Sequence, residues 1–147
     1  MALRDNRVLR VLVAIGAGAL TWHLLLGASM GILRLLWPAY DAAYPERDYT
    51  LVMLWVRLIV FSVTVIATST TSVLVGRDER LAWLAGLAIL GFSIPPHFYP
   101  GYIWHEYPPW YHYAWLLSIV PLAVASRPIR RQWVTRGSIR RLTSSCS

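Results

Sequence analysis

The chain has 147 residues, enough for one compact unit and too few for two. Hydrophobic residues make up 56% and charged residues 14%, whereas soluble domains carry about a quarter of charged residues. This composition departs from that of soluble domains and indicates a lipid environment. The formal net charge of +7 is also typical of nucleic-acid-binding proteins. The placement of the charges along the chain must therefore distinguish a membrane protein from a nucleic-acid-binding protein. The single cysteine, Cys146, excludes an internal disulfide and a cysteine-based metal site.

The first apolar stretch, residues 11–33, contains no formally charged side chain. As a helix it extends roughly 35 Å, enough to cross a hydrocarbon core about 30 Å thick with some tilt. A cleaved signal peptide is the alternative, because three arginines precede the stretch and the small residues 17–19 resemble a cleavage site. The apolar run continues well beyond Ala19, so we predict a retained membrane helix.

The second stretch, residues 51–75, holds one charge, Arg57, which a long uncharged run follows. The third stretch, residues 81–97, is interrupted near its end by Pro95 and Pro96. A helix that ends before these prolines reaches only about 21 Å. The third span must therefore stop short of the far interface or continue through the prolines in another conformation.

The fourth stretch, residues 110–126, has Pro109 at its start, where proline suits the first helical turn, and Pro121 inside, where we expect a kink. Helices are the default in lipid because each backbone polar group must be satisfied within its own segment. A β-barrel would need many alternating strands of about ten residues, and the continuous apolar runs exclude it. The predicted fold class is therefore all-α: one integral membrane bundle of four transmembrane helices.

Arginine and tyrosine divide between the two predicted membrane surfaces. Eleven arginines lie in the N-terminal segment, the loop after the second span and the tail, residues 127–147, whereas the opposite loops contain only Arg47 and four carboxylates. The positive-inside rule then predicts cytoplasmic N and C termini. All eight tyrosines lie in or beside the opposite loops, where amphipathic rings favour the headgroup level. We expect the basic tail to contact anionic lipid and not nucleic acid.

Small and hydroxyl-bearing residues indicate how the helices pack. The first helix offers Gly27 and Gly31 in a GxxxG spacing, and Ala14 and Gly18 at the same interval. The second helix carries seven hydroxyl residues within positions 62–72. Within lipid, such residues allow backbones to approach and supply hydrogen bonds. We expect packing within the chain, with homodimerisation through the Gly27/Gly31 face as the alternative.

Three polar side chains, those of His23, Arg34 and Arg57, are predicted to lie within the membrane, where ionisable groups are functional candidates by default. For His23 we favour a neutral ring hydrogen-bonded to a hydroxyl over a proton or ligand site. Hydroxyls at similar depth belong to Ser62, Thr64 and Ser118. For the two arginines we expect snorkelling to water or phosphate. Pairing with Asp41, Glu46, Asp48 or Glu106 is the sharper alternative, and anion binding is the third.

The segment 95–115 is the most unusual part of the chain, because nine of the 18 residues from Phe98 to Trp115 are aromatic. Its prolines are expected to prevent a continuous helix and to produce a compact interfacial loop. Imidazole and carboxylate bind transition metals, yet the spacing matches no known ligand pattern. We favour an interfacial belt, with a cleft for a quinone or lipid and a metal site as alternatives. The candidate ligand residues are His97, Trp104, His105, Glu106, Trp110, Tyr111 and His112, of which His105 and His112 are weak metal candidates.

The stretches P-P-H-F (residues 95–98) and P-P-W-Y-H-Y-A-W-L-L-S-I-V-P-L (residues 108–122) resemble a pattern in small bacterial four-helix membrane proteins. In that group a Pro-aromatic-Tyr-His segment opens the last helix. The resemblance covers about the last third of the chain and implies four spans in the bacterial inner membrane. It implies no activity, so no functional residue is carried over.

No nucleophile, oxyanion site or phosphate loop is evident in the sequence. The leading hypothesis is a non-catalytic accessory or assembly protein without a cofactor, whose partners are the bilayer and a second copy or another membrane protein. The first alternative is an outer-face binding protein for a hydrophobic ligand, such as a quinone or lipid, or for a metal. The second is a small oligomeric transporter, because four spans with few embedded charges disfavour a monomeric conduit. A membrane-embedded enzyme is favoured least.

Overall fold

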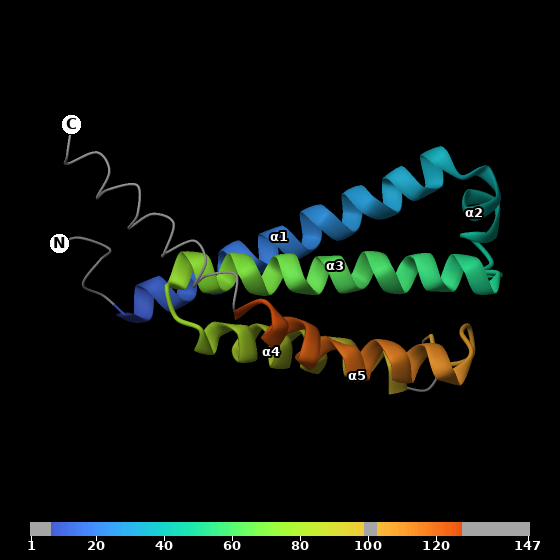
Figure 1. The fold of residues 1–147 in the computed structure, drawn as a ribbon. Coiled ribbons are helices and arrows are strands. Elements are labelled where there is room, and N and C mark those ends of the chain that lie inside the picture. Colours follow the sequence, from blue (N-terminus) through green and yellow to red (C-terminus); the bar gives the residue numbers. More distant parts are fainter. Residues whose placement is uncertain (1–6, 99–102, 128–147) are drawn as a thin grey trace.

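A computed structural model describes residues 7–98 and 103–127. Over these ranges the chain forms helices without any strand, which confirms the all-α class. The predicted basic tail lies outside the described residues from position 128 onward. The elements in chain order are α1 (Arg7–Leu36), α2 (Pro38–Ala43), α3 (Leu51–Gly76), α4 (Arg80–Phe98) and α5 (Pro109–Ala125) (Figure 1).

Local sequence signals account for several helix ends. Thr50 is the N-cap of α3, and its hydroxyl accepts a hydrogen bond from the Met53 amide at 3.4 Å. Such a cap satisfies one of the free N–H groups of the first turn. The helices α2 and α5 begin with Pro38 and Pro109, where the missing N–H is not needed. The C-cap of α3 is Arg77 with a φ of 55°, the left-handed conformation that ends many helices.

The expected interruption at Pro95 is wrong, because α4 continues through both prolines to Phe98. The ring of proline fixes φ near its helical value, so the penalty comes from a missing N–H and from a clash with the carbonyl four residues earlier. Pro95 and Pro96 lie in the last turn of α4, so the two missing N–H donors disturb only the end of the helix. The Ile103 amide donates to the Pro96 carbonyl at 3.3 Å and satisfies an acceptor at this helix end.

The helices form two hairpins that meet through α3. The first hairpin consists of α1 and α3, joined through α2, and the second consists of α4 and α5 (Figure 1). Helix α3 packs against α1, α4 and α5, whereas α1 has little contact with α4. The start of α1 and the end of α5 lie at the end of the molecule that also holds the α3–α4 turn, and α2 lies at the opposite end (Figure 1).

Small residues set the closest helix contacts. A Cβ at Gly18 would overlap the Ser72 hydroxyl and lie 3.3 Å from the Thr68 carbonyl, so α1 approaches α3 closely there. By contrast, Gly27 and Gly31 have nothing within 4 Å of a Cβ added to them. Packing within the chain thus accounts for the Gly18 position and not for the GxxxG spacing.

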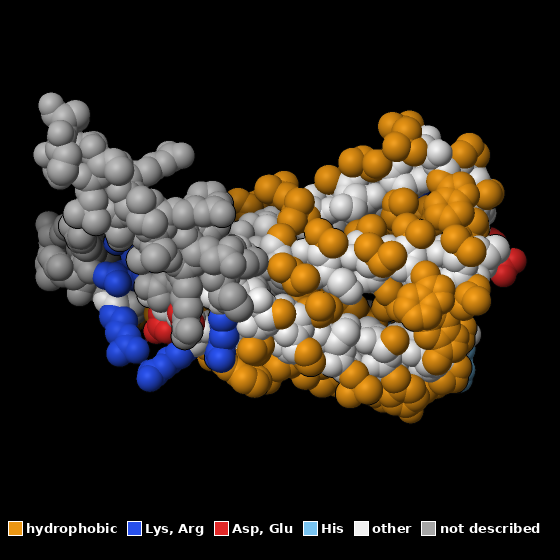
Figure 2. All heavy atoms as spheres, viewed as in Figure 1, with side chains coloured by type: hydrophobic (Ala, Val, Ile, Leu, Met, Phe, Trp, Pro, Cys, Tyr) orange, Lys and Arg blue, Asp and Glu red, His pale blue; other side chains and the backbone are white. Residues whose placement is uncertain are grey.

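Three helices, α1, α3 and α4, are long and apolar enough to cross a membrane. Large apolar side chains point outward, with Leu35, Phe92 and Leu117 all more than 70% exposed. Figure 2 shows apolar side chains along the sides of the helices and basic side chains at the end where α1 begins. This surface is typical of a membrane protein, because a soluble monomer rarely exposes so large an apolar area.

Candidate functional site

Arg57 lies on α3, about 9 Å along the helix from Leu51. Its guanidinium donates to four tyrosine hydroxyls, which together with Arg57 we call the Arg57–tyrosine cluster. Nη1 donates to Tyr40 at 2.7 Å and to Tyr49 at 3.2 Å. Nη2 donates to Tyr107 at 3.3 Å, and Nε donates to Tyr111 at 3.4 Å.

The four tyrosines come from different parts of the chain. Tyr40 lies in α2, Tyr49 precedes α3, Tyr107 precedes α5, and Tyr111 lies in the first turn of α5. The rings add to the hydrogen bonds: the guanidinium lies 4.7 Å from the Tyr49 ring centre, and the rings of Tyr49 and Tyr107 are stacked at 5.9 Å. One arginine therefore ties both hairpins together at the end opposite the start of α1 and the end of α5.

The cluster solvates a partly buried cation without an anion. A guanidinium has five N–H donors, and four of them meet neutral phenolic oxygens here. Among the residues that the structure describes, Arg57 forms no ion pair. The alternative in which Arg57 pairs with an outer-loop carboxylate is therefore wrong for the described residues. Phenols replace water around the charge, which offsets part of the cost of moving a guanidinium out of water. This cost is about 2.5–3.5 kcal/mol at the centre of a membrane helix and smaller near its ends, where Arg57 lies.

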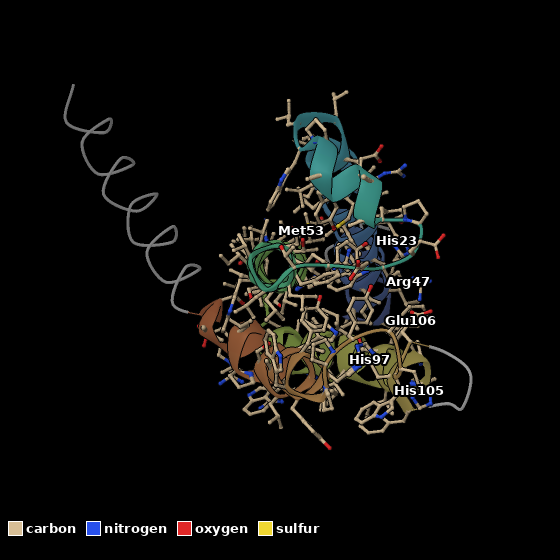
Figure 3. All side chains as sticks on the ribbon, turned by 90° about the vertical axis from the view of Figure 1, so that its right-hand side faces the viewer. His23, Arg47, Met53, His97, His105 and Glu106 are labelled. Carbon is tan, nitrogen blue, oxygen red and sulfur yellow. The ribbon has the colours of Figure 1, made fainter. Side chains whose placement is uncertain are left out.

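Two exposed ion pairs flank the cluster. Arg34 at the end of α1 lies 2.6 Å from Asp41 in α2, so Arg34 forms the alternative pairing with an outer-loop carboxylate in place of the expected snorkelling. Arg47 pairs with Glu106 and links the two connections at this end, as Figure 3 shows. Exposed pairs of this kind contribute only about 0–1 kcal/mol each. Their role is to orient the connections around the cluster.

Burial sets the protonation of the two cluster tyrosines outside the helices. It raises the pKa of the Tyr49 phenol well above its ordinary value, although the charge of Arg57 acts in the opposite direction. Burial also raises the pKa of the Tyr107 phenol, opposed by Arg57 and Arg47. Both phenols are therefore neutral at physiological pH and serve as hydrogen-bond acceptors.

A second group of rings lies beside the cluster and includes several of the sequence-predicted residues. The buried rings of His97 and His112 meet edge to face, with centres 5.1 Å apart. Trp104 stacks on His112 at 4.6 Å, and its carbonyl lies 3.2 Å from the His112 Nε2. His97 contacts the Ser93 carbonyl through Nδ1 at 2.6 Å. The imidazoles of His97 and His112 thus each bond to a backbone carbonyl.

The other predicted ligand residues take separate positions. His105 is exposed, and Glu106 is held by Arg47. Trp110 packs on Trp55 at 5.5 Å and meets Tyr111 edge to face. Within residues 7–98 and 103–127, no three His, Cys, Asp or Glu side chains lie close enough to hold a metal ion.

The structure gives His23 a different partner from the hydroxyl that the sequence predicts. Its Nδ1 lies 2.8 Å from the Ala19 carbonyl, one turn back on α1, and the side chain is exposed. The proposed hydroxyl partners each donate to a carbonyl of their own helix; these are Ser62, Thr64 and Ser118. The prediction assumed only equal depth, whereas the orientation of α1 decides which way His23 faces.

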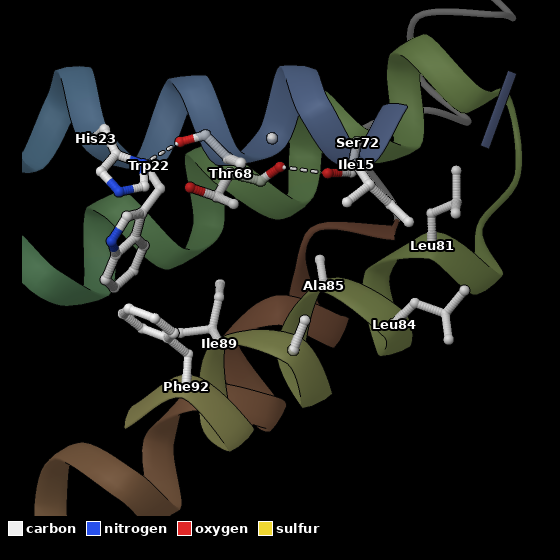
Figure 4. A pocket seen from close by; sticks show the side chains of 13 residues that line it. Ile15, Trp22, His23, Thr68, Ser72, Leu81, Leu84, Ala85, Ile89 and Phe92 are labelled. Atoms are coloured by element: carbon white, nitrogen blue, oxygen red, sulfur yellow. Dashed lines mark hydrogen bonds between the residues drawn. The ribbon is translucent and has the colours of Figure 1, made fainter. Parts of the chain in front are cut away.

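His23 instead lines a cavity of about 290 Å³ between α1, α3 and α4, which we call the α1/α4 groove. Its polar side chains are His23, Thr68 and Ser72, and Figure 4 shows Leu84, Ile89 and Phe92 of α4 on the facing wall. The groove was not predicted, because its residues come from three helices whose tilt the sequence does not specify. The free space follows from the sparse contact between α1 and α4.

Sequence reasoning also missed the Arg57–tyrosine cluster. The tyrosines were interpreted as an interfacial belt. A signal for the cluster was present, because Arg57 is predicted to lie toward the same end of the helices as the tyrosines. No protein-family model, curated protein or solved structure matches the chain. The geometry described above therefore carries the functional conclusion.

Proposed function

We propose that the chain is a four-span protein of the bacterial inner membrane, with α1, α3, α4 and α5 crossing the bilayer and both termini in the cytoplasm. Helix α5 has 17 residues and reaches about 26 Å, and it packs against α3 and α4, which supports placing it at the same depth. Arg7, Arg77, Arg80 and Arg127 lie at or just beyond the helix ends on the side where α1 begins, whereas the cluster tyrosines gather at the other end. This division supports the proposed orientation.

Within that position the protein acts as a non-catalytic accessory or assembly component that engages another membrane constituent from the side. The observation that carries this proposal is the Arg57–tyrosine cluster. In this cluster the arginine and four phenols at the outer end form hydrogen bonds with one another. Interaction through the lipid-facing helix surface, where α1 and α4 leave a groove, is the mode of action that the geometry favours.

Cysteine labelling tests the orientation. In intact cells, a membrane-impermeant maleimide is expected to leave Cys146 unlabelled and to label His105→Cys in a Cys146→Ser background, since His105 is exposed at the outer end. After permeabilisation both positions are expected to react. Equal accessibility of the two positions in intact cells contradicts the proposed topology.

The intact mass of the protein in lipid nanodiscs tests the accessory role. Extraction into nanodiscs without detergent is expected to give a complex of defined composition that exceeds one chain. A groove-mouth variant, Phe92→Arg, is expected to dissociate it, and Leu117→Arg serves as the control, because Leu117 on α5 is similarly exposed and does not line the groove. A bare monomer for the unmodified protein, or identical behaviour of both variants, argues against this role.

A further inference from the structure

Arg34 and Asp41 leave most of their hydrogen-bonding groups unused. Their ion pair joins Nε of Arg34 to Oδ1 of Asp41 at 2.6 Å, and the two side chains are 46% and 48% exposed. A guanidinium has five N–H donors, so those on Nη1 and Nη2 remain, together with the second oxygen of Asp41. Within residues 7–98 and 103–127 neither side chain forms another hydrogen bond. A cation and an anion with free bonding groups therefore lie side by side at the surface.

The ring of Tyr44 orients the guanidinium. The Arg34 Cζ lies 4.3 Å from the centre of this ring. A ring covers one face of the planar guanidinium and leaves its in-plane N–H groups available. These parallel donors match the oxygens of a phosphate, which arginine binds through two hydrogen bonds at once. Arg34 is thus placed to recognise a phosphate group.

The ion pair lines a hollow of about 600 Å³ between the end of α1 and α2. This volume lies within the range of roughly 300–1,000 Å³ that is usual for ligand pockets. The rest of the lining is small or apolar, and the complete lining is Gly31, Arg34, Leu35, Pro38, Asp41 and Ala42. A Cβ at Gly31 would meet nothing within 4 Å, and Leu35 is 81% exposed, so the hollow is open on its apolar side.

Arg34 lies at the headgroup level in the proposed membrane position. Arg10 and Arg34 are separated by roughly 36 Å along α1, whereas the hydrocarbon core is about 30 Å thick. Gly27, Gly31 and Arg34 follow one another at helical intervals, which places them on one face of α1. A Cβ at either glycine would meet nothing within 4 Å. An acyl chain that descends from the hollow can therefore lie along this face.

The two charges of the hollow select the headgroup. An anionic lipid would place its phosphate on Arg34 and leave Asp41 facing a second negative charge. A zwitterionic headgroup avoids this repulsion, because its phosphate faces Arg34 while its ammonium faces Asp41. An exposed ion pair contributes only about 0–1 kcal/mol, so its rearrangement around a headgroup costs little. A primary ammonium also supplies N–H donors to the free oxygen of Asp41, which a quaternary ammonium lacks.

We propose that the hollow at Arg34 and Asp41 binds a phospholipid with an ethanolamine headgroup from the outer leaflet. Arg34 donates to the phosphate, Asp41 accepts from the ammonium, and an acyl chain lies over Gly31 and Gly27. The inference rests on the proposed topology, which places this end of α1 at the outer surface of the membrane. It adds a lipid partner to the proposed accessory role, at a site separate from the α1/α4 groove.

Lipid retention by the purified full chain tests the inference. Nanodiscs contain equal amounts of phosphatidylethanolamine, phosphatidylcholine and phosphatidylglycerol with identical acyl chains, and intact-mass spectrometry counts the lipid that stays on the released protein. Phosphatidylethanolamine is expected to be enriched about tenfold over phosphatidylglycerol. Phosphatidylcholine is expected to lie between them, because it has the same charges without the N–H donors. Equal retention of these lipids overturns the inference.

Two charge variants are expected to change the lipid preference in different ways. Arg34→Gln should reduce retention of phosphatidylethanolamine about tenfold, the effect of one hydrogen bond to a charged group. Asp41→Asn should shift the preference toward phosphatidylglycerol, because the repelling carboxylate is gone. Arg47→Gln is the matched control, since Arg47 belongs to another partly exposed ion pair at this end and does not line the hollow. An unchanged preference in Asp41→Asn, or an equal loss in Arg47→Gln, overturns the inference.

Gly31→Leu separates the lipid from other occupants of the hollow. Leucine fills the space without a clash, so retention of phosphatidylethanolamine should fall while the unfolding midpoint stays unchanged or rises. An excess of glycerophosphoethanolamine, which has the headgroup without acyl chains, is expected not to displace the lipid. Displacement by this soluble compound overturns the lipid assignment. A two-chain complex that Gly31→Leu reduces to one chain does so as well, in favour of a second copy.

Cysteine labelling and intact mass separate this inference from the proposed function. Loss of lipid selectivity together with the expected labelling defeats the inference alone. Selective retention together with reversed labelling defeats the topology and moves the same lipid site to the inner leaflet. Selective retention by a single chain supports the lipid site and defeats the accessory role.

Discussion

Arg57 Nη1 donates to the Tyr40 hydroxyl at 2.7 Å, and this is the shortest contact that Arg57 makes in the cluster. The Tyr40 side chain is fully buried, and its own hydroxyl donates to the Met30 sulfur at 3.4 Å. Tyr40 therefore connects α1, α2 and α3 through one oxygen. Removing either partner deletes this charged hydrogen bond, although Arg57 keeps its three other tyrosine acceptors and Tyr40 keeps its contact with the Met30 sulfur.

Replacing Tyr40 with phenylalanine tests this contact. We expect Tyr40→Phe to lower the free energy of unfolding by about 1.5–3 kcal/mol, the range for hydrogen bonds to a charged group. Tyr113→Phe is the control, because Tyr113 is half exposed and lies outside the cluster. Denaturant unfolding in detergent micelles measures both variants. Equal stability of the two would show that the cluster hydrogen bonds contribute little.

Alkaline pH is expected to destabilise the outer end. Burial raises the pKa of Tyr49 and of Tyr107 in the folded protein, so folding favours the protonated phenols. Their contribution is complete below the ordinary tyrosine pKa of about 10 and is lost as pH rises through the folded values. Unfolding midpoints measured from pH 8 upward should therefore fall above about pH 10. The double variant Tyr49→Phe/Tyr107→Phe should flatten this fall, and an unchanged pH profile contradicts the assignment.

Two glycines of α1 offer a matched pair for packing. Gly18→Ala is expected to destabilise the protein, because the added Cβ overlaps Ser72 against the α3 backbone. Gly27→Ala meets nothing within 4 Å and should gain up to about 1 kcal/mol from the better helix propensity of alanine. The unfolding midpoints of the two variants should therefore move in opposite directions. A loss at Gly27 equal to that at Gly18 would contradict the packing of α1 described above.

The apolar runs predict most of the helical layout because lipid requires each segment to satisfy its own backbone. Helix α3 begins at the predicted residue 51 and ends one residue beyond the predicted limit of 75. The short helix α2 was not predicted, since six residues carry too little periodicity. The continuation of α4 through Pro95 was not predicted either, because the position of a proline within a helix decides how much of that helix it disrupts.

The candidate site was predictable in composition and not in connectivity. Arg57 was identified as an embedded charge, yet its partners follow from the rotation of α3 relative to α2 and α5. Snorkelling to water or phosphate was the expectation for Arg57, and carboxylates were the alternative because charge pairing is a usual solution for a buried cation. Phenols provide another way to satisfy the cation. Which phenols bond to it depends on which connecting segment lies over the guanidinium. His97 and His112 were grouped from sequence, while their edge-to-face contact required the hairpin of α4 and α5.

The distance along the chain between Arg57 and its acceptors has a consequence for biosynthesis. Tyr107 and Tyr111 follow Arg57 by 50 and 54 positions. At about 5–20 residues per second, the ribosome takes roughly 3–10 s to reach them. During that interval only two of the four phenols, those of Tyr40 and Tyr49, are available to the Arg57 guanidinium. Translation of the last third of the chain then supplies the other two acceptors.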